Sequence, residues 1–526
     1  MTESDLPVVR MAHGRWGDPD RKTVLPAMAL EALRHLGARP TPAALGVPDL
    51  PTPTSTLVTA LAAVVGAAQV KTDNETRWRH TRGYSTPDLL RDRAGDTADA
   101  PDLVVLPGSH DEVQELLTVC AELGLAVVPF AGGTSVVGGL APQREGYDAV
   151  VAVDLARLDE LVEVDDISRT AILQAGLRGP AAEAKLAEHG FTLGHFPQSY
   201  EGASIGGYAA TRSSGQSSAG FGRFDQMVVG LTVATPRGTI RLGRAPHSAA
   251  GPDLRQLFLG SEGAFGIITS VVVRVRPRAV ERAFEGWRFA SFDAGLNAVR
   301  RLAQDGPLPT VLRLSDEVET AVNLADPGAA SAGGCVAICG FEGARIAGRQ
   351  AEVAEVLQAA GGEPLGEGPG EAWRVGRYNA PYLRDPLLDE GGLVETLETA
   401  GFWSTLPALK LAVTEALVTA LSDQGTPPIV LCHVSHVYET GASLYFTVLC
   451  AQADEPIAQW GKAKQAASDA IAKAGGTITH HHAVGADHRS AYEAEIGPLA
   501  IEALQAVKAV LDPARTMNPG ILLPPA

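Results

Sequence analysis

The sequence lacks long apolar runs, a disulfide framework and an excess of positive charge. No segment reaches the ~18 consecutive apolar residues that a transmembrane helix requires, so none is predicted. The five cysteines are an odd number without regular spacing, which excludes a disulfide scaffold and indicates a reducing compartment. The net charge of -18 argues against nucleic acid as the main partner.

The residues that are present describe a soluble globular protein with more than one core. At 526 residues the chain exceeds one ordinary domain, and its composition is 45% hydrophobic and 20% charged. Residues 1–5 are acidic and lack an apolar core, so no signal peptide is predicted. We therefore expect a cytoplasmic protein. Peripheral contact with a membrane and a homodimeric assembly both stay open.

Apolar patterning divides the chain into four regions of an α+β protein. Residues 1–98 read as helical pieces interrupted by prolines. Residues 99–277 begin with a β-α-β pattern and continue with further strands. In residues 278–485 strands alternate with helices, which predicts a second domain with an antiparallel sheet. Residues 486–526 form a helical C-terminal segment.

Three local features within these regions follow from capping and turn residues. Asp111 is expected to cap the helix that runs to Gly124. The glycines between residues 361 and 370 predict a loop. One helix is expected over residues 492–511, ending before Asp512-Pro513.

A glycine-rich turn follows the apolar, strand-like residues 125–128. Glycine lets the backbone approach a ligand closely and adopt positive φ, and successive amides in such a turn form a concave site for anionic oxygens. A diphosphate is the natural guest, although the spacing fits neither common dinucleotide signature. The turn consists of Pro129, Phe130, Ala131, Gly132, Gly133, Thr134 and Ser135.

Together with other segments, this turn resembles the vanillyl-alcohol-oxidase-type flavoprotein superfamily and, within it, the alkyl-dihydroxyacetone-phosphate synthase family. The similarity runs from Gly14-Arg15-Trp16-Gly17 to Asn518-Pro519-Gly520 and covers nearly the whole chain. The resemblance implies a two-subdomain FAD-binding domain and an α+β cap domain with an antiparallel sheet. The family's own motifs are matched by Arg79-His80-Thr81-Arg82-Gly83, Tyr382-Leu383-Arg384-Asp385, Tyr438-Glu439-Thr440-Gly441-Ala442 and His480-His481-His482.

The resemblance implies FAD as the cofactor, held by several separate segments. No attachment residue stands near the turn, because Cys120 lies inside the apolar pattern of a helix and His80 lies far upstream. The implied binding is therefore noncovalent. Besides the glycine-rich turn, the implied cofactor-binding residues are Gln198, Ser199, Ala203, Ser204, Gly207, Thr211, Arg212, Ser213, Ser214, Glu262, Gly263, Gly266, Ile267, Ile268 and Asn518.

The resemblance assigns two further side chains to the substrate. Arg384 matches the arginine that holds the substrate phosphate, a role that suits a planar, bidentate guanidinium. From the sequence alone, a surface ion pair with Asp385 is the alternative. Tyr445 matches the family's catalytic tyrosine, and strand alternation puts it on one face with Ser443. A buried core tyrosine, or Tyr438 acting instead, are the alternatives there.

Three consecutive histidines, His480, His481 and His482, are uncommon in a protein core. An unperturbed imidazole titrates near pH ~6.5, so the triplet can exchange protons in neutral solution. In an extended segment, His480 and His482 would share one face. The resemblance implies a proton-handling cluster beside the flavin. A metal site with Asp487 and His488 is the alternative, and no metal is assigned because the synthase reaction needs none.

The resemblance implies a transferase that acts on two lipid substrates in ether-lipid synthesis, 1-acyl-dihydroxyacetone phosphate and a long-chain fatty alcohol. The alcohol replaces the fatty acid, the flavin acts as an electrophile, and there is no net redox change. The rival function is that of a 2-hydroxyacid dehydrogenase or oxidase of the same superfamily, acting on D-lactate or glycolate. In that reaction Arg384 would hold a carboxylate, and a histidine would take the hydroxyl proton.

Noncovalent FAD can be tested by denaturing the purified protein with acid and centrifuging it. Because the sequence offers no attachment residue near the turn, the yellow colour should stay in the supernatant. A washed pellet that keeps the flavin would demonstrate a covalent link and refute this prediction.

Overall fold

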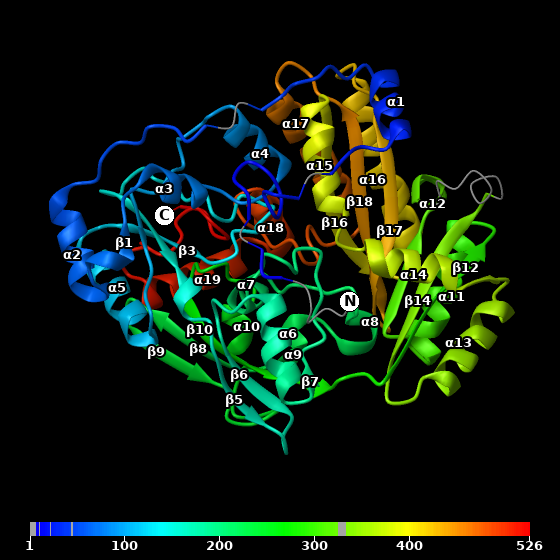
Figure 1. The fold of residues 1–526 in the computed structure, drawn as a ribbon, viewed down its shortest axis with the longest axis horizontal. Coiled ribbons are helices and arrows are strands. Elements are labelled where there is room, and N and C mark those ends of the chain that lie inside the picture. Colours follow the sequence, from blue (N-terminus) through cyan, green and yellow to red (C-terminus); the bar gives the residue numbers. More distant parts are fainter. Residues whose placement is uncertain (1–6, 10, 22, 44–45, 324–332, 526) are drawn as a thin grey trace.

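The computed structural model describes residues 7–525, except for residues 10, 22, 44–45 and 324–332. Residues 1–5, on which the expectation of no signal peptide rests, lie outside the described part. The described chain forms a four-stranded, a five-stranded and a seven-stranded sheet, together with a two-stranded one, and helices cover them (Figure 1). The mixture of helices with largely antiparallel sheets confirms the predicted α+β class.

The first sheet has the strand order β1-β2-β4-β3, and β2, β4 and β3 run parallel. Helix α5 connects β2 to β3 and buries Cys120 in the core of this layer. The prediction that Asp111 caps α5 was wrong. The Ser109 side chain accepts from the Glu112 amide, because Ser109 is extended whereas Asp111 already lies in the first turn. The elements are β1 Val70–Lys71, β2 Leu103–Val105, α5 His110–Glu122, β3 Ala126–Phe130 and β4 Val150–Asp154.

The second sheet has the order β5-β6-β10-β8-β9, and each pair of neighbours is antiparallel. Helices α6 and α7 bury apolar side chains against it. The elements of this layer are η3 Leu155–Arg157, β5 Leu161–Asp165, β6 Thr170–Gln174, α6 Gly179–Glu188, β7 Phe191–Thr192, α7 Ile205–Ala210, α8 Ser218–Phe221, α9 Phe224–Met227, β8 Val228–Thr235, β9 Gly238–Leu242, α10 Arg255–Phe258, β10 Ile267–Arg274 and β11 Arg276–Pro277, with β7 and β11 forming the two-stranded sheet.

The third sheet is antiparallel throughout, with the order β15-β12-β14-β13-β17-β18-β16. Leu444 and Phe446 of β18 are fully buried in the core that this sheet shares with its helices, as strand alternation predicts for the face opposite Tyr445. The elements are β12 Glu281–Phe289, α11 Phe292–Asp305, β13 Val311–Ser315, α12 Glu317–Asn323, β14 Cys335–Gly343, α13 Ala347–Ala359, β15 Glu363–Gly366, α14 Glu367–Gly376, α15 Ala380–Asp389, β16 Gly392–Phe402, α16 Leu406–Ser422, β17 Ile429–Val437, β18 Gly441–Ala451 and α17 Pro456–Lys473.

Residues 361–370 are not the predicted loop. They contain β15 and the first turn of α14, and Gly366, with φ of 74°, makes the corner between them. Glycines here mark a tight strand-to-helix corner and the close packing of Gly370 against the backbone of Phe284, rather than an irregular segment.

The C-terminal part of the chain packs beside the first sheet. The helix expected over 492–511 is broken at Gly497, whose φ of 80° ends α18, and Pro498 starts α19. After α19 the chain runs beside β3, where the Val127 amide donates to the Thr516 carbonyl. The remaining elements are α1 Ala27–His35, α2 Ser55–Val65, η2 Ala67–Gln69, α3 Asn74–Arg79, α4 Thr86–Arg93, α18 Arg489–Ile496 and α19 Pro498–Leu511.

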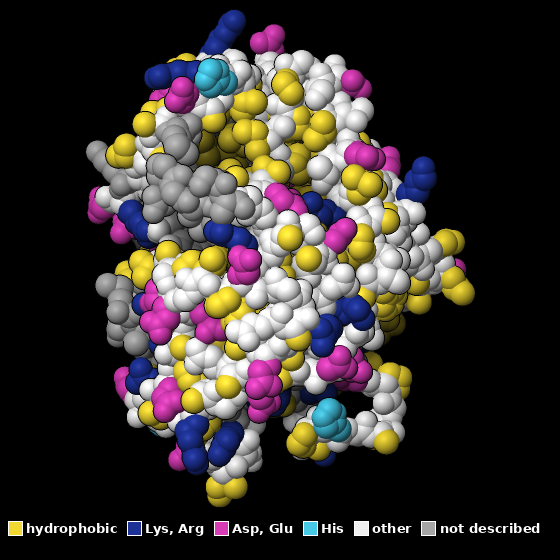
Figure 2. All heavy atoms as spheres, turned by 90° about the vertical axis from the view of Figure 1, so that its right-hand side faces the viewer, with side chains coloured by type: hydrophobic (Ala, Val, Ile, Leu, Met, Phe, Trp, Pro, Cys, Tyr) yellow, Lys and Arg dark blue, Asp and Glu magenta, His cyan; other side chains and the backbone are white. Residues whose placement is uncertain are grey.

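The apolar character of the helices and the distribution of surface charge can be compared with the expectations about membrane and nucleic-acid partners. Among the described residues, no helix combines the length and the apolar character needed to cross a membrane. On the face that carries the seven-stranded sheet and its helices, described side chains of both charge signs lie scattered among hydrophobic ones (Figure 2). Neither sign dominates the described part of that face.

Candidate active site

A cavity of about 420 Å³ lies between the glycine-rich turn and the seven-stranded sheet. This volume is typical of small-molecule pockets. The turn after β3, the loops around α7 and the start of β10 supply one wall, and β16, β17 and β18 supply the other. The residues predicted to bind the cofactor that line it are Pro129, Phe130, Ala131, Gly132, Gly133, Thr134, Ser135, Gln198, Ser199, Ala203, Ser204, Gly207, Thr211, Ser213, Ser214, Glu262, Gly263, Gly266, Ile267 and Ile268.

The glycine-rich turn presents unused hydrogen-bond donors to this cavity. Among the described residues, none accepts a hydrogen bond from the amides of Gly132, Gly133, Thr134 or Ser135. A Cβ on Gly132 would collide with the carbonyl oxygen of Gly202, so this stretch tolerates only glycine. Unpaired amides are costly unless a ligand or water satisfies them, and a row of them suits the oxygens of a diphosphate.

Two predicted cofactor residues support the cavity from outside. Arg212 donates from Nε to the Leu259 carbonyl at 2.8 Å and does not line the cavity. The Asn518 amide donates to the carbonyls of Gly139 at 3.1 Å and Glu262 at 2.7 Å. Arg212, Glu262 and Asn518 all have positive φ, at 50°, 49° and 41°. Such strain in non-glycine residues is typical of functional sites, where the surrounding contacts enforce it.

Glu262 joins the two walls of the cavity. Its carboxylate accepts from the amides of Val484 at 3.0 Å and Gly485 at 2.7 Å, just beyond the histidine triplet. Burial raises the pKa of Glu262 to about 7, against the effect of these two amides. The loop that leads into β10 is thereby tied to the segment that carries the histidines.

The cavity leaves open space beside α7. In α7 the residues on either side of Gly207 are buried, whereas Gly207 itself is exposed to the cavity. A Cβ on Gly207 would meet only the Ser204 hydroxyl, at 3.2 Å. Space beside a glycine, next to unpaired amides, is what a backbone cradle for a diphosphate requires. The side-chain oxygen of Ser214, which lines the cavity, is buried without a hydrogen-bond partner among the described residues, so it too can bond a ligand.

On the opposite wall, strand register aligns three polar residues. Tyr445 of β18 pairs with Glu398 of β16 on one side and with His433 of β17 on the other. The Tyr445 ring stacks on His433 with the centroids 4.9 Å apart, and on His481 with the centroids 5.9 Å apart. Tyr445 therefore lines the cavity from a rigid sheet, whereas Tyr438 does not line it.

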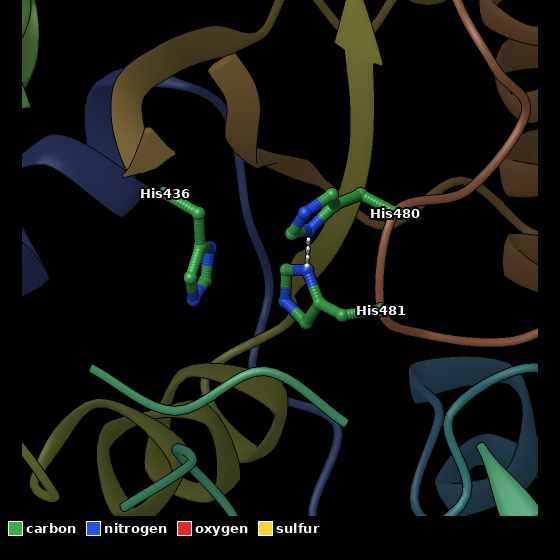
Figure 3. A group of neighbouring side chains, drawn as sticks. All are labelled: His436, His480 and His481. Atoms are coloured by element: carbon green, nitrogen blue, oxygen red, sulfur yellow. Dashed lines mark hydrogen bonds between the residues drawn. The ribbon is translucent and has the colours of Figure 1, made fainter. Parts of the chain in front are cut away.

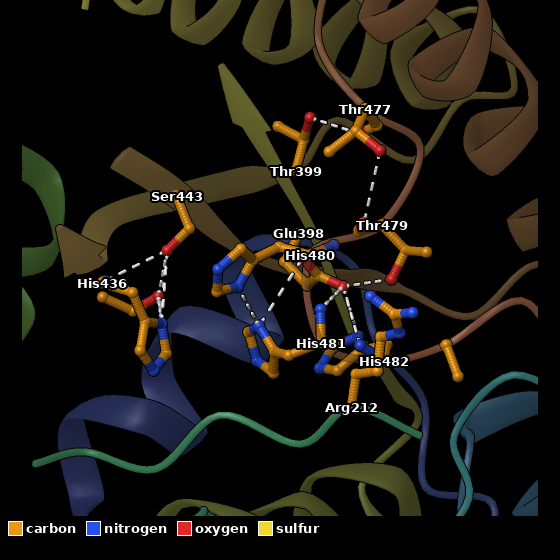
Figure 4. A network of polar contacts seen from close by, with 12 residues as sticks. Arg212, Glu398, Thr399, His436, Ser443, Thr477, Thr479, His480, His481 and His482 are labelled. Carbon is orange, nitrogen blue, oxygen red and sulfur yellow. Dashed lines mark hydrogen bonds and ion pairs between the residues drawn. The ribbon is translucent and has the colours of Figure 1, made fainter. Parts of the chain in front are cut away.

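The Glu398 carboxylate holds the histidine triplet in place (Figure 4). It accepts from the backbone amides of His480 at 2.6 Å, His481 at 3.1 Å and His482 at 2.9 Å, and from the Thr479 hydroxyl at 2.6 Å. Burial opposes ionisation, but the imidazoles of the triplet and the Thr479 hydroxyl hold the pKa of Glu398 well below its usual range. Glu398 is thus a buried carboxylate that is fully hydrogen-bonded.

The expectation that His480 and His482 share a face was wrong. His481 and His482 line the cavity, whereas His480 points away and its Nε2 lies 2.5 Å from the Tyr438 hydroxyl. The alternation argument assumed an extended segment. Instead, the triplet bends around Glu398 so that three successive amides reach one carboxylate.

Tyr445, His481 and His482 on this wall are uncharged at neutral pH. Burial raises the pKa of Tyr445 to about 12, so its hydroxyl keeps its proton. Burial lowers the pKa of His481 to about 3, although Glu398 opposes this, and it lowers the pKa of His482 in the same direction. At neutral pH the cavity therefore contains a phenol that can donate and imidazoles with free lone pairs.

Sequence reasoning missed a second polar cluster on this wall. Arg313 of β13 lies 2.9 Å from Nε2 of His433 and donates to Glu319 at 2.8 Å. All three residues line the cavity. The usable signal was a charged or titratable residue inside an otherwise apolar strand, as in Val311-Leu312-Arg313-Leu314 and in Leu397-Glu398-Thr399.

Arg384 reaches the cavity from α15. In the described part of the chain it forms no ion pair with Asp385, whose carboxylate instead accepts from the Trp16 amide at 2.8 Å. The Arg384 Nη1 donates to the Tyr84 carbonyl at 2.6 Å, and its Nε is buried without a partner among the described residues. The Tyr84 amide in turn donates to the Ser135 carbonyl of the glycine-rich turn at 2.7 Å. An anion at Arg384 would therefore sit next to the turn.

The alternative of a metal site is not favoured by the hydrogen bonds. His436, His480 and His481 have ligand atoms within 4.8 Å of one another (Figure 3). However, Nε2 of His436 lies 3.1 Å from the Gly215 carbonyl and its Nδ1 lies 2.8 Å from the Ser435 hydroxyl. Asp487 pairs with Lys464 at 2.9 Å, away from the triplet. Both nitrogens of His436 and both nitrogens of His480 are therefore engaged in hydrogen bonds, which leaves neither residue a free lone pair for a metal.

Two family models match the chain. The model described as FAD binding domain matches residues 101–243, and the model described as FAD linked oxidases, C-terminal domain, matches residues 278–522. The two matches include the glycine-rich turn, α7, Arg384, Tyr445 and the triplet. FAD is the cofactor of this protein, in agreement with the unpaired amides and the open space at Gly207.

The cradle at Gly207 can be tested by filling it. In Gly207→Val the new side chain has room within the protein but enters the cavity, so FAD affinity should fall by about 10-fold or more, or about 1.4 kcal/mol. Titrating the deflavinated protein with FAD would measure it. Gly461→Val is the control, because Gly461 is an exposed glycine of α17 with no atom within 4 Å of its Cβ. Equal FAD affinity in both variants would refute the cradle.

Relatives identify the family. The alkyldihydroxyacetonephosphate synthase of Dictyostelium discoideum is 34% identical over 87% of this chain and 79% of its own length, and that of Trypanosoma brucei brucei is 32% identical over 88% and 79%. A solved alkyldihydroxyacetonephosphate synthase superposes with a TM-score of 0.82 at 29% identity, covering 97% of both chains. The chain therefore belongs to the alkyldihydroxyacetonephosphate synthase family.

Proposed function

We propose that this protein exchanges the acyl chain of 1-acyl-dihydroxyacetone phosphate for a long-chain fatty alcohol. The observation that carries the proposal is a single cavity in which Arg384, Tyr445 and His482 lie across from a row of unpaired backbone amides. In the exchange, a carbon–oxygen bond to the fatty acid breaks and a carbon–oxygen bond to the alcohol forms, with no net oxidation. Such a reaction needs an anion site, a proton donor and a proton acceptor beside the cofactor.

Arg384 is the proposed anchor for the substrate phosphate. Arg384 lines the cavity, and its Nε is buried without a partner among the described residues. The guanidinium can therefore donate two parallel hydrogen bonds to a phosphate. Its Nη1 bond to the Tyr84 carbonyl fixes the direction of the fork. The phosphate would then hold the reacting carbon at a constant distance from the rest of the site.

Tyr445 and His482 have different proposed roles, one as a hydrogen-bond donor and the other as a proton acceptor. Burial raises the pKa of Tyr445 to about 12, so Tyr445 keeps its proton and donates a hydrogen bond to the departing carboxylate. His482 is neutral and lines the cavity, with its Nδ1 4.0 Å from Glu398. It can therefore take the proton from the carbon, hold it as an imidazolium beside that carboxylate, and return it to the carbon once the alcohol has added. When bound by the turn and by α7, FAD supplies an electrophilic ring at the reacting carbon.

The lipid chains add two expectations about partners. Both substrates carry long apolar chains and would reside in a membrane, so the protein would bind the membrane surface peripherally to reach them. A homodimer is the proposed assembly, which sedimentation of the purified protein would measure.

The role of Arg384 can be tested by a substitution that keeps the charge. Arg384→Lys loses the bidentate geometry, so affinity for acyl-dihydroxyacetone phosphate should fall by about 10-fold or more while FAD content is unchanged. Isothermal titration would measure both ligands. Arg301→Lys, an exposed position on α11, is the matched control. Wild-type affinity in the Arg384→Lys protein would remove this residue from the phosphate site.

The reaction class can be tested with the flavin spectrum under anaerobic conditions. Acyl-dihydroxyacetone phosphate should bleach the bound flavin, and a fatty alcohol should restore its absorbance without oxygen consumption. Tyr445→Phe should slow bleaching by ~10²–10⁴-fold with FAD still bound, because the donor hydroxyl is missing. Tyr492→Phe, on α18 outside the cavity, should behave as the wild type.

A different result in the same experiment would establish the rival function. Bleaching by D-lactate or glycolate, reversed by an electron acceptor and not by an alcohol, would make the protein a 2-hydroxyacid dehydrogenase. The two outcomes use the same protein and the same readout, so one preparation distinguishes them.

A further inference from the structure

A continuous chain of hydrogen bonds leads from Tyr438 to the cavity. The Tyr438 hydroxyl lies 2.5 Å from Nε2 of His480. Nδ1 of His480 lies 3.0 Å from Nδ1 of His481 (Figure 3). At the end remote from the cavity, the Arg223 guanidinium is an electrostatic neighbour of the same Tyr438 hydroxyl and pairs with Asp225 at 3.1 Å. Only His481, at the outer end, lines the cavity.

The end remote from the cavity gives this chain of hydrogen bonds a direction. A guanidinium has donors and no acceptor, so Arg223 cannot accept the hydroxyl proton of Tyr438. The adjacent cation favours the phenol as a donor, and a separation of 2.5 Å suits an O–H donor better than an N–H donor. Tyr438 therefore donates to Nε2 of His480, which leaves the proton of a neutral His480 on Nδ1 to donate to His481.

The neighbours of His481 are consistent with this direction. Its Nδ1 lies 3.6 Å from Glu398, beyond hydrogen-bond distance, and that carboxylate is already engaged by the amides of the triplet. His436 does not compete, because the Gly215 carbonyl and the Ser435 hydroxyl occupy its two nitrogens. With Nδ1 accepting from His480, the proton of a neutral His481 is on Nε2, for which no described residue is a partner.

We propose that Tyr438 and His480 act as positioning residues that fix His481 with its proton on Nε2, as a donor to the substrate, and restore that proton after it is used. This proposal rests on the proposed exchange reaction and adds a role for two residues outside the cavity. It also separates His481, a donor, from His482, the acceptor.

Every proton that moves along the hydrogen bonds from Tyr438 to His481 is accounted for. When His481 gives the Nε2 proton to a departing carboxylate oxygen, its Nδ1 takes the proton from Nδ1 of His480. His480 in turn takes the Tyr438 proton on Nε2, which leaves a phenolate beside the Arg223 cation. When the entering alcohol loses its proton to Nε2 of His481, the same three transfers run backwards and restore the resting state.

The resting arrangement can be measured without any substrate. In protein labelled with ¹⁵N-histidine, His481 should show a protonated Nε2 and an unprotonated Nδ1, with the signal assigned by its loss in His481→Asn. In Tyr438→Phe the chain has no O–H donor, so His480 and His481 should become mixtures of both tautomers. A wild-type His481 protonated on Nδ1, or an unchanged tautomer in Tyr438→Phe, would overturn the proposal.

Turnover supplies the second readout. Tyr438→Phe should lower kcat by about 10²-fold, with KM and FAD content unchanged, whereas Tyr492→Phe should leave kcat as in the wild type. A Tyr438→Phe enzyme with wild-type kcat would contradict the replenishing role. Should the wild type itself not turn over acyl-dihydroxyacetone phosphate, the exchange reaction fails, while the tautomer measurement still decides the hydrogen-bond direction.

Discussion

The buried carboxylate of Glu398 is the group on which the cavity wall formed by β16, β17 and β18 depends. A carboxylate that is 2% exposed is tolerated only when hydrogen bonds satisfy its oxygens, and here the amides of three successive histidines do so. Strand β16 and the segment after α17 must therefore come together for either to be stable. Because Glu398 is in register with Tyr445, the same carboxylate also sets the triplet against the tyrosine.

That the glycine-rich turn and α7 line one cavity could be predicted from the sequence, because the requirements of such a wall are local. A backbone that approaches a ligand closely requires glycine at particular positions. The sequence has glycine at these positions, namely Gly132 and Gly133 in the turn and Gly207 in α7. Tyr445 followed from strand alternation, since β18 is a regular strand whose other face, with Leu444 and Phe446, is fully apolar and buried.

The other wall could not be predicted, because distant strands assemble it. Glu398, Arg313 and His433 meet Tyr445 only through the pairing order of the seven-stranded sheet, which no local pattern specifies. The error at His480 has a related cause. Alternation holds for a segment that pairs as a strand, whereas the triplet follows the position of a carboxylate that lies about eighty residues earlier in the chain.

The backbone of Tyr84 joins the glycine-rich turn to Arg384. Its amide donates to the Ser135 carbonyl while its carbonyl accepts from Arg384, and Gly83 permits this contact because a Cβ there would collide with the Ser135 oxygen. If the turn binds the cofactor and Arg384 the substrate phosphate, as proposed, a ligand that orders one of them would also order the other. The two affinities would then be linked, and such a linkage is reciprocal: the phosphate ester would raise the affinity for the flavin by the same factor by which the flavin raises the affinity for the ester.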